Sequence, residues 1–77
     1  MKALVELVAR SLVDHPDAVV VDVVDGPQTA TIEVRVAADD VGKLIGRGGR
    51  IIKAIRTLAR AAATGSGKRV NVEVLRP

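Results

Sequence analysis

The chain has 77 residues, no cysteine, no aromatic residue and a formal net charge of +3. This length suits one small domain with an aliphatic core, and the absence of cysteine excludes a disulfide framework and a cysteine-based metal site. No apolar run approaches the roughly 18 residues of a membrane span. Glu6 and Arg10 interrupt the first segment, which therefore differs from a secretory signal, and we expect a cytoplasmic protein.

The N-terminal third predicts a helix from Lys2 to about Asp14, because apolar residues recur there at helical spacing. Pro16 then stops the pattern, since the residue before a proline is disfavoured in helical geometry. On a helical wheel the charged residues Lys2, Glu6, Arg10 and Asp14 share one side. Another side is less polar and consists of Leu4, Leu7, Val8, Ser11 and Leu12.

A β-hairpin is predicted next. Residues 19–24 form a β-branched run, and the segment Asp25-Gly26-Pro27 is a turn signal. Residues 29–37 then alternate cleanly, with one expected inward face made of Ala30, Ile32, Val34 and Val36.

The remaining elements are two helices and a last strand. Asp39 or Asp40 is expected to cap a short helix that runs through Ile45. A glycine-rich turn follows, then a helix over residues 50–63 and an alternating strand over 69–75. The order α-β-β-α-α-β predicts an α+β fold in which helices pack on one face of a three-stranded sheet.

Charge is segregated along the chain. Residues 1–40 contain eight acidic and three basic residues, whereas residues 41–72 contain eight basic residues and no acidic one. This separation indicates a polyanionic partner, with nucleic acid as the first candidate. Glycines at 46, 48 and 49 remove side chains that would hold a sugar-phosphate backbone away, and the following helix offers free N–H groups at its start.

The segment from Leu44 to Ile52 resembles the signature of the KH domain, in which Gly-x-x-Gly joins two helices. Gly46 and Gly49 match the two glycines, and Arg47 and Gly48 match the variable pair. The extra helix and strand precede the central β-α-α-β unit, as they do in the type II arrangement. The resemblance therefore implies that residues 1–77 form a single type II KH domain.

Three further segments narrow the resemblance: residues 4–9, 14–17 and 53–58. With the loop, they resemble the small stand-alone bacterial KH proteins of the KhpA (YlqC-like) family over essentially the whole chain. One departure is Gly48, because the family often has a bulkier polar residue there. We expect a more mobile loop as a result.

A binding site is implied by this resemblance. In KH domains the loop clamps the backbone of about four nucleotides, while single-stranded bases lie in an adjoining apolar groove. Lys43 and Arg50 would flank the loop, and Lys53 would reach a neighbouring phosphate. Ile45 and Ile52 would contribute to the groove floor. The clamp itself would consist of Gly46, Arg47, Gly48 and Gly49. Without aromatic rings for stacking, binding by one domain should be weak, salt-sensitive and poorly sequence-selective.

The resemblance also implies a role and partners. It indicates an RNA chaperone or adaptor that acts on single-stranded RNA, with links to cell-wall homeostasis, cell shape and cell division in some bacteria. It further implies a homodimer, or a heterodimer with a larger KH-containing protein (KhpB, also called Jag or EloR). Two alternatives remain open: an assembly subunit whose RNA contact depends on that partner, and a binder of single-stranded DNA.

The sequence gives little support for a catalytic site or a metal site. His15 is the single histidine, and the Asp39-Asp40 pair is explained more simply by helix capping than by a metal site. Gly42-Lys43 lacks the glycine spacing of a P-loop, and Ile51 occupies the third glycine position of a dinucleotide-binding motif. We expect neither an enzyme nor a cofactor.

Overall fold

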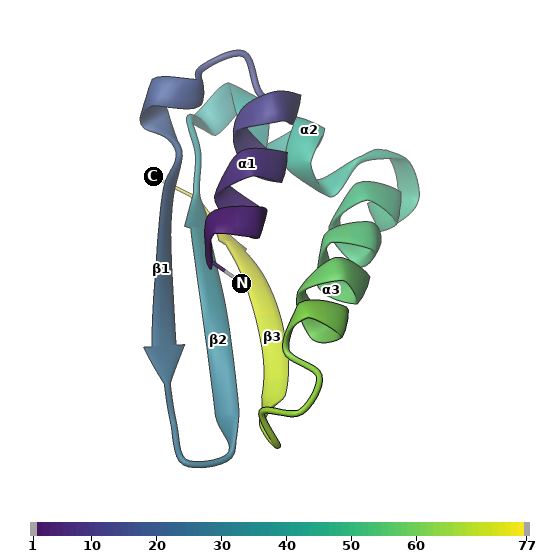
Figure 1. Cartoon of the computed structure of the whole chain (residues 1–77). Helices are drawn as coiled ribbons and strands as arrows, with labels where there is room; N and C mark the ends of the chain where they lie inside the picture. The colour runs from purple at the N-terminus through teal and green to yellow at the C-terminus, as the bar shows by residue number, and fades with distance from the viewer. Residues whose placement is uncertain (1, 77) are drawn as a thin grey trace.

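The computed structural model describes residues 2–76. Three helices and three strands follow one another in the predicted order: α1 (Lys2–Leu12), β1 (Val20–Asp25), β2 (Thr29–Arg35), α2 (Val41–Ile45), α3 (Arg50–Ala62) and β3 (Arg69–Leu75). The helices lie against one side of the sheet (Figure 1), where α1 contacts β1 and α3 contacts β3. None of the helices in the described part of the chain is long and apolar enough to cross a membrane.

The sheet is mixed, with strand order β1-β2-β3. The hairpin pairs β1 and β2 antiparallel, and its turn closes with a 2.7 Å hydrogen bond from the Gly26 N–H to the Thr29 carbonyl. β3 pairs with β2 in parallel, which requires a long crossover between them. That crossover consists of α2 and α3, so the glycine loop that joins them lies at one end of the molecule (Figure 1).

An aliphatic core lies between the sheet and the helices. The apolar face predicted for residues 29–37 is buried: Ala30, Ile32 and Val34 of β2 and Val36 just after it all lie in the interior, and Val70 and Val72 of β3 join them. Ile52, Ile55 and Ala59 supply the buried stripe of α3, three residues at helical spacing. The opposite face of the sheet carries the exposed, mostly polar residues of the alternating pattern.

The less polar side of α1 coincides only in part with its buried side, since Val8 packs against the core. Val5 and Ala9 are its buried residues, whereas Leu7 is 66% exposed and Leu12 is 38% exposed. The helix carries apolar residues around most of its circumference, so periodicity finds the helix without selecting its buried side. The small side chain of Ala9 allows close packing, and α1 turns that side toward the core.

The expected capping role of the aspartates is also corrected. Asp40 occupies the position before α2, but its side chain makes no capping hydrogen bond to that helix. Its carboxylate instead accepts hydrogen bonds from the backbone N–H groups of Asp14 at 3.1 Å and His15 at 2.9 Å. Asp40 is fully buried, and it ties the segment after α1 to the start of α2.

Candidate nucleic-acid interface

The glycine loop has a tightly defined backbone. α2 ends where the Gly46 N–H donates to the Gly42 carbonyl at 2.9 Å, and a 3₁₀ turn over Arg47–Gly49 closes with Gly49 N–H to Gly46 carbonyl at 3.1 Å. Gly46, Gly48 and Gly49 have φ values of 76°, 63° and 77°. Residues with a side chain rarely adopt such values, so the three glycines are what allows this path.

The glycines differ in what surrounds them. A Cβ atom on Gly46 would lie 2.6 Å from Cγ1 of Ile51, so this position is filled by the neighbouring helix. A Cβ atom on Gly48 would have nothing within 4 Å. Gly46 therefore serves the packing of the loop, and Gly48 presents bare backbone to solvent.

Positive charge and a helix start without a side-chain cap meet beside Gly48. α3 begins at Arg50, whose own N–H donates to the Arg47 carbonyl, and Gly49 before it has no side chain to cap the next N–H groups of the helix. A helix start of this kind attracts anions through its free N–H groups and the helix dipole. Arg47, Arg50 and Lys53 are exposed, and within residues 2–76 no carboxylate lies at ion-pair distance from them.

Lys43 has a different environment from these cations. Its ammonium group forms ion pairs with Asp14 and with Asp40, the latter at 3.4 Å. The hydrogen bond to Asp14, together with the two nearby negative charges, raises the pKa of Lys43 despite partial desolvation. Its charge is already matched by these carboxylates, so Lys43 is less available to a phosphate than Arg47 or Arg50.

The two isoleucines of the predicted groove, Ile45 and Ile52, differ in their exposure to solvent. Ile52 is 6% exposed and belongs to the core, so its side chain has almost no surface left for a ligand. Ile45 is 37% exposed and lines an open hollow of about 520 Å³ with Ala38, Val41, Gly42 and Arg76. This hollow lies next to the loop, because Ile45 is the residue immediately before Gly46.

Arg76 is a candidate residue that sequence reasoning missed. Arg76 follows β3 and is far from α2 in the sequence. It nevertheless lines the same hollow as Val41 and Gly42 of α2. The parallel pairing of β3 with β2 brings their C-terminal ends together, beside the start of α2. No local motif carries this information, and only the strand order would have revealed it.

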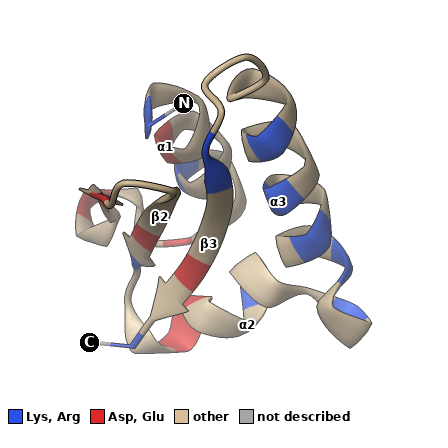
Figure 2. Ribbon diagram, turned by 90° about the horizontal axis from the view of Figure 1, so that it is seen from below, with Lys and Arg blue, Asp and Glu red and all other residues tan. Residues whose placement is uncertain are grey.

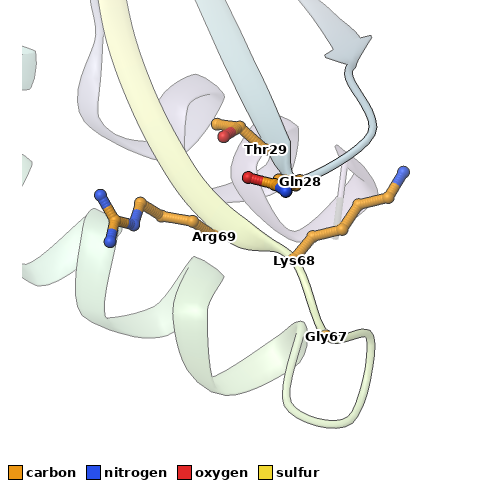
Figure 3. A pocket seen from close by; sticks show the side chains of 5 residues that line it. All are labelled: Gln28, Thr29, Gly67, Lys68 and Arg69. Carbon is orange, nitrogen blue, oxygen red and sulfur yellow. The ribbon is translucent and has the colours of Figure 1, made fainter.

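A second, more polar hollow of about 650 Å³ lies at the opposite end of the sheet. Figure 3 shows the residues that line it: Gln28, Thr29, Gly67, Lys68 and Arg69. The side chains of Lys68 and Arg69 extend in different directions. The Lys68 ammonium group forms an ion pair with Asp25 at 3.1 Å, so Lys68 is less available to bind a phosphate. The loop and this hollow are therefore separate features.

His15, Asp39 and Asp40 bring three possible metal-ligating atoms within 4.8 Å of one another. Both Asp40 oxygens already accept backbone hydrogen bonds, and His15 Nε2 lies 3.1 Å from an Asp39 oxygen. Burial acts to raise the pKa of Asp40, but the N–H groups of Asp14 and His15 and the Lys43 ammonium outweigh it and lower that pKa. The cluster is thus explained by its internal contacts.

Comparison with known proteins identifies the family to which this fold belongs. Residues 2–74 match the family model described as KhpA/KhpB, KH domain. The chain belongs to the KhpA/KhpB KH-domain family. Its fold is accordingly the α+β KH arrangement that the element order predicted, with three helices and a mixed three-stranded sheet.

Curated members of the KhpA/KhpB family resemble the chain over nearly its full length. The RNA-binding protein KhpA of Clostridium acetobutylicum is 53% identical over 97% of this chain and 100% of its own length. The RNA-binding protein KhpA of Caldanaerobacter subterraneus is 52% identical with the same coverage, and that of Borreliella burgdorferi is 47% identical over 94% of this chain and 88% of its own. These relatives are named for binding and not for catalysis, in agreement with the expectation of a non-enzyme. No solved structure matches the chain.

Proposed function

We propose that this protein binds single-stranded RNA by holding its sugar-phosphate backbone at the loop Gly46–Gly49. The observation that carries the proposal is the coincidence of three features at one place: bare backbone at Gly48, the uncapped start of α3, and the unpaired cations Arg47 and Arg50. A phosphate there would accept N–H hydrogen bonds and gain charge-assisted contacts from the arginines. The KhpA relatives are named RNA-binding proteins, which supports RNA as the ligand.

The hollow beside the loop suits a base. Ile45 and Val41 offer apolar surface, Gly42 leaves room above α2, and Arg76 supplies hydrogen-bond donors at the wall. A base attached to the clamped backbone would lie against these residues. No aromatic ring is present in the chain, so stacking adds little, and one domain should bind weakly and with low sequence preference. Such binding fits an RNA chaperone or adaptor.

The test compares three proteins in fluorescence anisotropy titrations with labelled oligouridine of 12 nucleotides. One is the wild type, one is Arg47→Asp/Gly48→Asp, and the third is Arg10→Asp/Asp17→Gly, a control on the N-terminal segment. The loop variant should lose binding by at least about 100-fold at low salt, because several phosphate contacts become repulsive. The control should bind like the wild type. Equal affinity of the loop variant and the wild type, with both folded by circular dichroism, would refute the proposal.

Oligothymidine of the same length distinguishes RNA from single-stranded DNA in the same assay. A preference for RNA would require contacts to the 2′-hydroxyl group. Equal affinities would favour a general single-strand binder.

Self-association is a second candidate function, supported by exposed leucines on the helical side. Leu7 of α1 is 66% exposed and Leu58 of α3 is 46% exposed, and these two helices contact each other. A contiguous apolar patch formed by such residues would serve as an interaction surface. Sedimentation equilibrium of the wild type and of Leu58→Glu tests this: a dimer that becomes a monomer supports an assembly role, and a monomeric wild type opposes a homodimer.

A further inference from the structure

We propose that a bound RNA strand continues from the loop along the exposed basic face of α3, so that one domain holds about eight nucleotides. This inference rests on the proposed function of the loop and extends the site along α3. The residues that would carry it beyond the loop are Lys53, Arg56 and Arg60.

The cations form a continuous row on the helix. Arg50, Lys53, Arg56 and Arg60 are spaced by three, three and four residues, which places one on each successive turn of α3. Figure 2 shows basic segments running along α3 from the loop toward its C-terminal end. Ten residues of helix rise about 15 Å, a length that about four stacked nucleotides span at ~3.4 Å each. Added to about four nucleotides at the loop, this gives about eight.

None of these cations is neutralised by the protein. In the described range 2–76, no carboxylate lies at ion-pair distance from any of the four. The first helix provides a comparison within the same molecule. There Glu6 pairs with Lys2 at 3.9 Å and with Arg10 at 3.2 Å, one turn away on each side. The chain therefore uses such pairs on α1 and omits them on α3.

This arrangement is unfavourable for the isolated helix. Like charges three or four residues apart repel each other, and Arg50 and Lys53 stand in the first turn, where the helix dipole disfavours cations. A surface selected for helix stability alone would carry acidic residues at these places. A row of phosphates along α3 would relieve both effects, which is why we assign the row to ligand binding.

The opposite side of the molecule directs the strand toward α3. Glu33 of β2 lies directly beside Asp22 of β1 and Glu73 of β3 in the strand registers, on the sheet face that no helix covers. Three carboxylates in one row repel phosphate, and Arg35 and Arg69 on the same face offset them only in part. The open sheet face is therefore less favourable for a strand than the basic row on α3.

The experiment measures binding of oligouridines of 6 and 12 nucleotides to the wild type and three variants. Arg56→Gln/Arg60→Gln removes two charges from the row. Arg10→Gln/Arg35→Gln removes two charges elsewhere and serves as the control of equal net charge. Gly48→Asp tests the loop separately. Anisotropy reports the 12-mer, and amide shifts in two-dimensional NMR titrations report weak binding of the 6-mer.

The row variant should bind the 12-mer about tenfold more weakly at 0.1 M salt, and its log–log salt slope should fall by about 1.4, at ~0.7 per lost phosphate contact. Its affinity for the 6-mer should change by less than about twofold, because the shorter strand is held mainly at the loop. The control should match the wild type with both lengths. Equal losses for both lengths, or an equal loss in the control, would overturn the extended path. Undiminished binding by Gly48→Asp would instead overturn the proposed loop function.

Discussion

The buried carboxylate of Asp40 accepts a hydrogen bond of 2.9 Å from the backbone N–H of His15, a residue 25 positions earlier in the chain. The second oxygen accepts the Asp14 N–H in the same way, so one side chain holds the segment between α1 and β1. Asp40→Ala would leave both N–H groups without their partner. We expect its melting temperature to fall by about 10 °C or more, whereas Asp39→Ala, which alters an exposed neighbour, should change it by less than about 3 °C. Equal effects in a thermal circular dichroism scan would contradict the anchoring role of Asp40.

The protonation of His15 should be linked to Asp39. The hydrogen bond to Asp39 and its negative charge, with smaller contributions from Asp40 and Asp14, raise the pKa of His15 above its ordinary value of 6.5. A raised pKa in the folded state stabilises the fold fully below pH 6.5, and the contribution is lost as pH rises through the folded-state pKa. Because His15 is exposed, the effect on stability should be small. NMR titration of the imidazole should give a higher pKa in the wild type than in Asp39→Asn, and identical values would contradict the pairing.

Two glycines of the loop should differ in their tolerance of alanine. Gly46→Ala combines a positive φ with a Cβ 2.6 Å from Ile51, and we expect a loss of about 2–4 kcal/mol in the free energy of unfolding. Gly48→Ala has the positive φ but open space, so its cost should be about 1 kcal/mol. Urea denaturation measures both values. Similar losses would show that the packing against Ile51 contributes nothing.

Ile52 and Ile45 should have separable roles. Ile52→Ala would open a cavity in the core and cost about 2–4 kcal/mol of stability. Ile45→Ala removes a side chain that is already partly exposed and should cost less than about 1.5 kcal/mol. RNA affinity at a temperature where both variants are folded completes the comparison: it should fall for Ile45→Ala and stay near the wild-type value for Ile52→Ala.

The acidic row on the open sheet should be a site where a neutral substitution stabilises the protein. Glu33 stands between Asp22 and Glu73, and like charges directly opposite each other weaken a sheet. Glu33→Gln should raise the free energy of unfolding by about 0.5 kcal/mol at low ionic strength. The gain should shrink in 0.5 M salt, which screens the repulsion. Glu6→Gln, which breaks two ion pairs on α1, should show no gain.

The sequence predicted the helices and strands well where a local pattern was strong. The apolar stripe of α3 repeats at helical spacing against a uniformly basic opposite side, so the predicted range 50–63 lies within one residue of the observed Arg50–Ala62. The alternation in β2 likewise identified its buried face. The glycine turn was located for a similar reason, because glycine with positive φ has few substitutes.

Local sequence patterns did not predict contacts between residues that are far apart in the sequence. The ion pair of Lys43 with Asp14 joins residues that lie 29 positions apart, and nothing near Lys43 in the sequence indicates it. Arg76 reaches its hollow only through the parallel pairing of β3 with β2. On α1, the less polar side of the wheel includes the exposed residues Leu7 and Leu12, whereas the fully buried residues are Val5 and Ala9.

The uncovered sheet face with its three carboxylates has a consequence for stoichiometry. Five cations of the loop and α3 have no carboxylate at ion-pair distance among residues 2–76, while Asp22, Glu33 and Glu73 share the open sheet face with Arg35 and Arg69, so positive charge is concentrated on the helical side and gives the molecule an electric dipole. Near a polyanion this dipole turns the protein loop-first before any contact forms. The loop and α3 together form one such surface on each molecule. Annealing two RNA molecules through this surface would therefore require at least two copies of the chain, each carrying one strand.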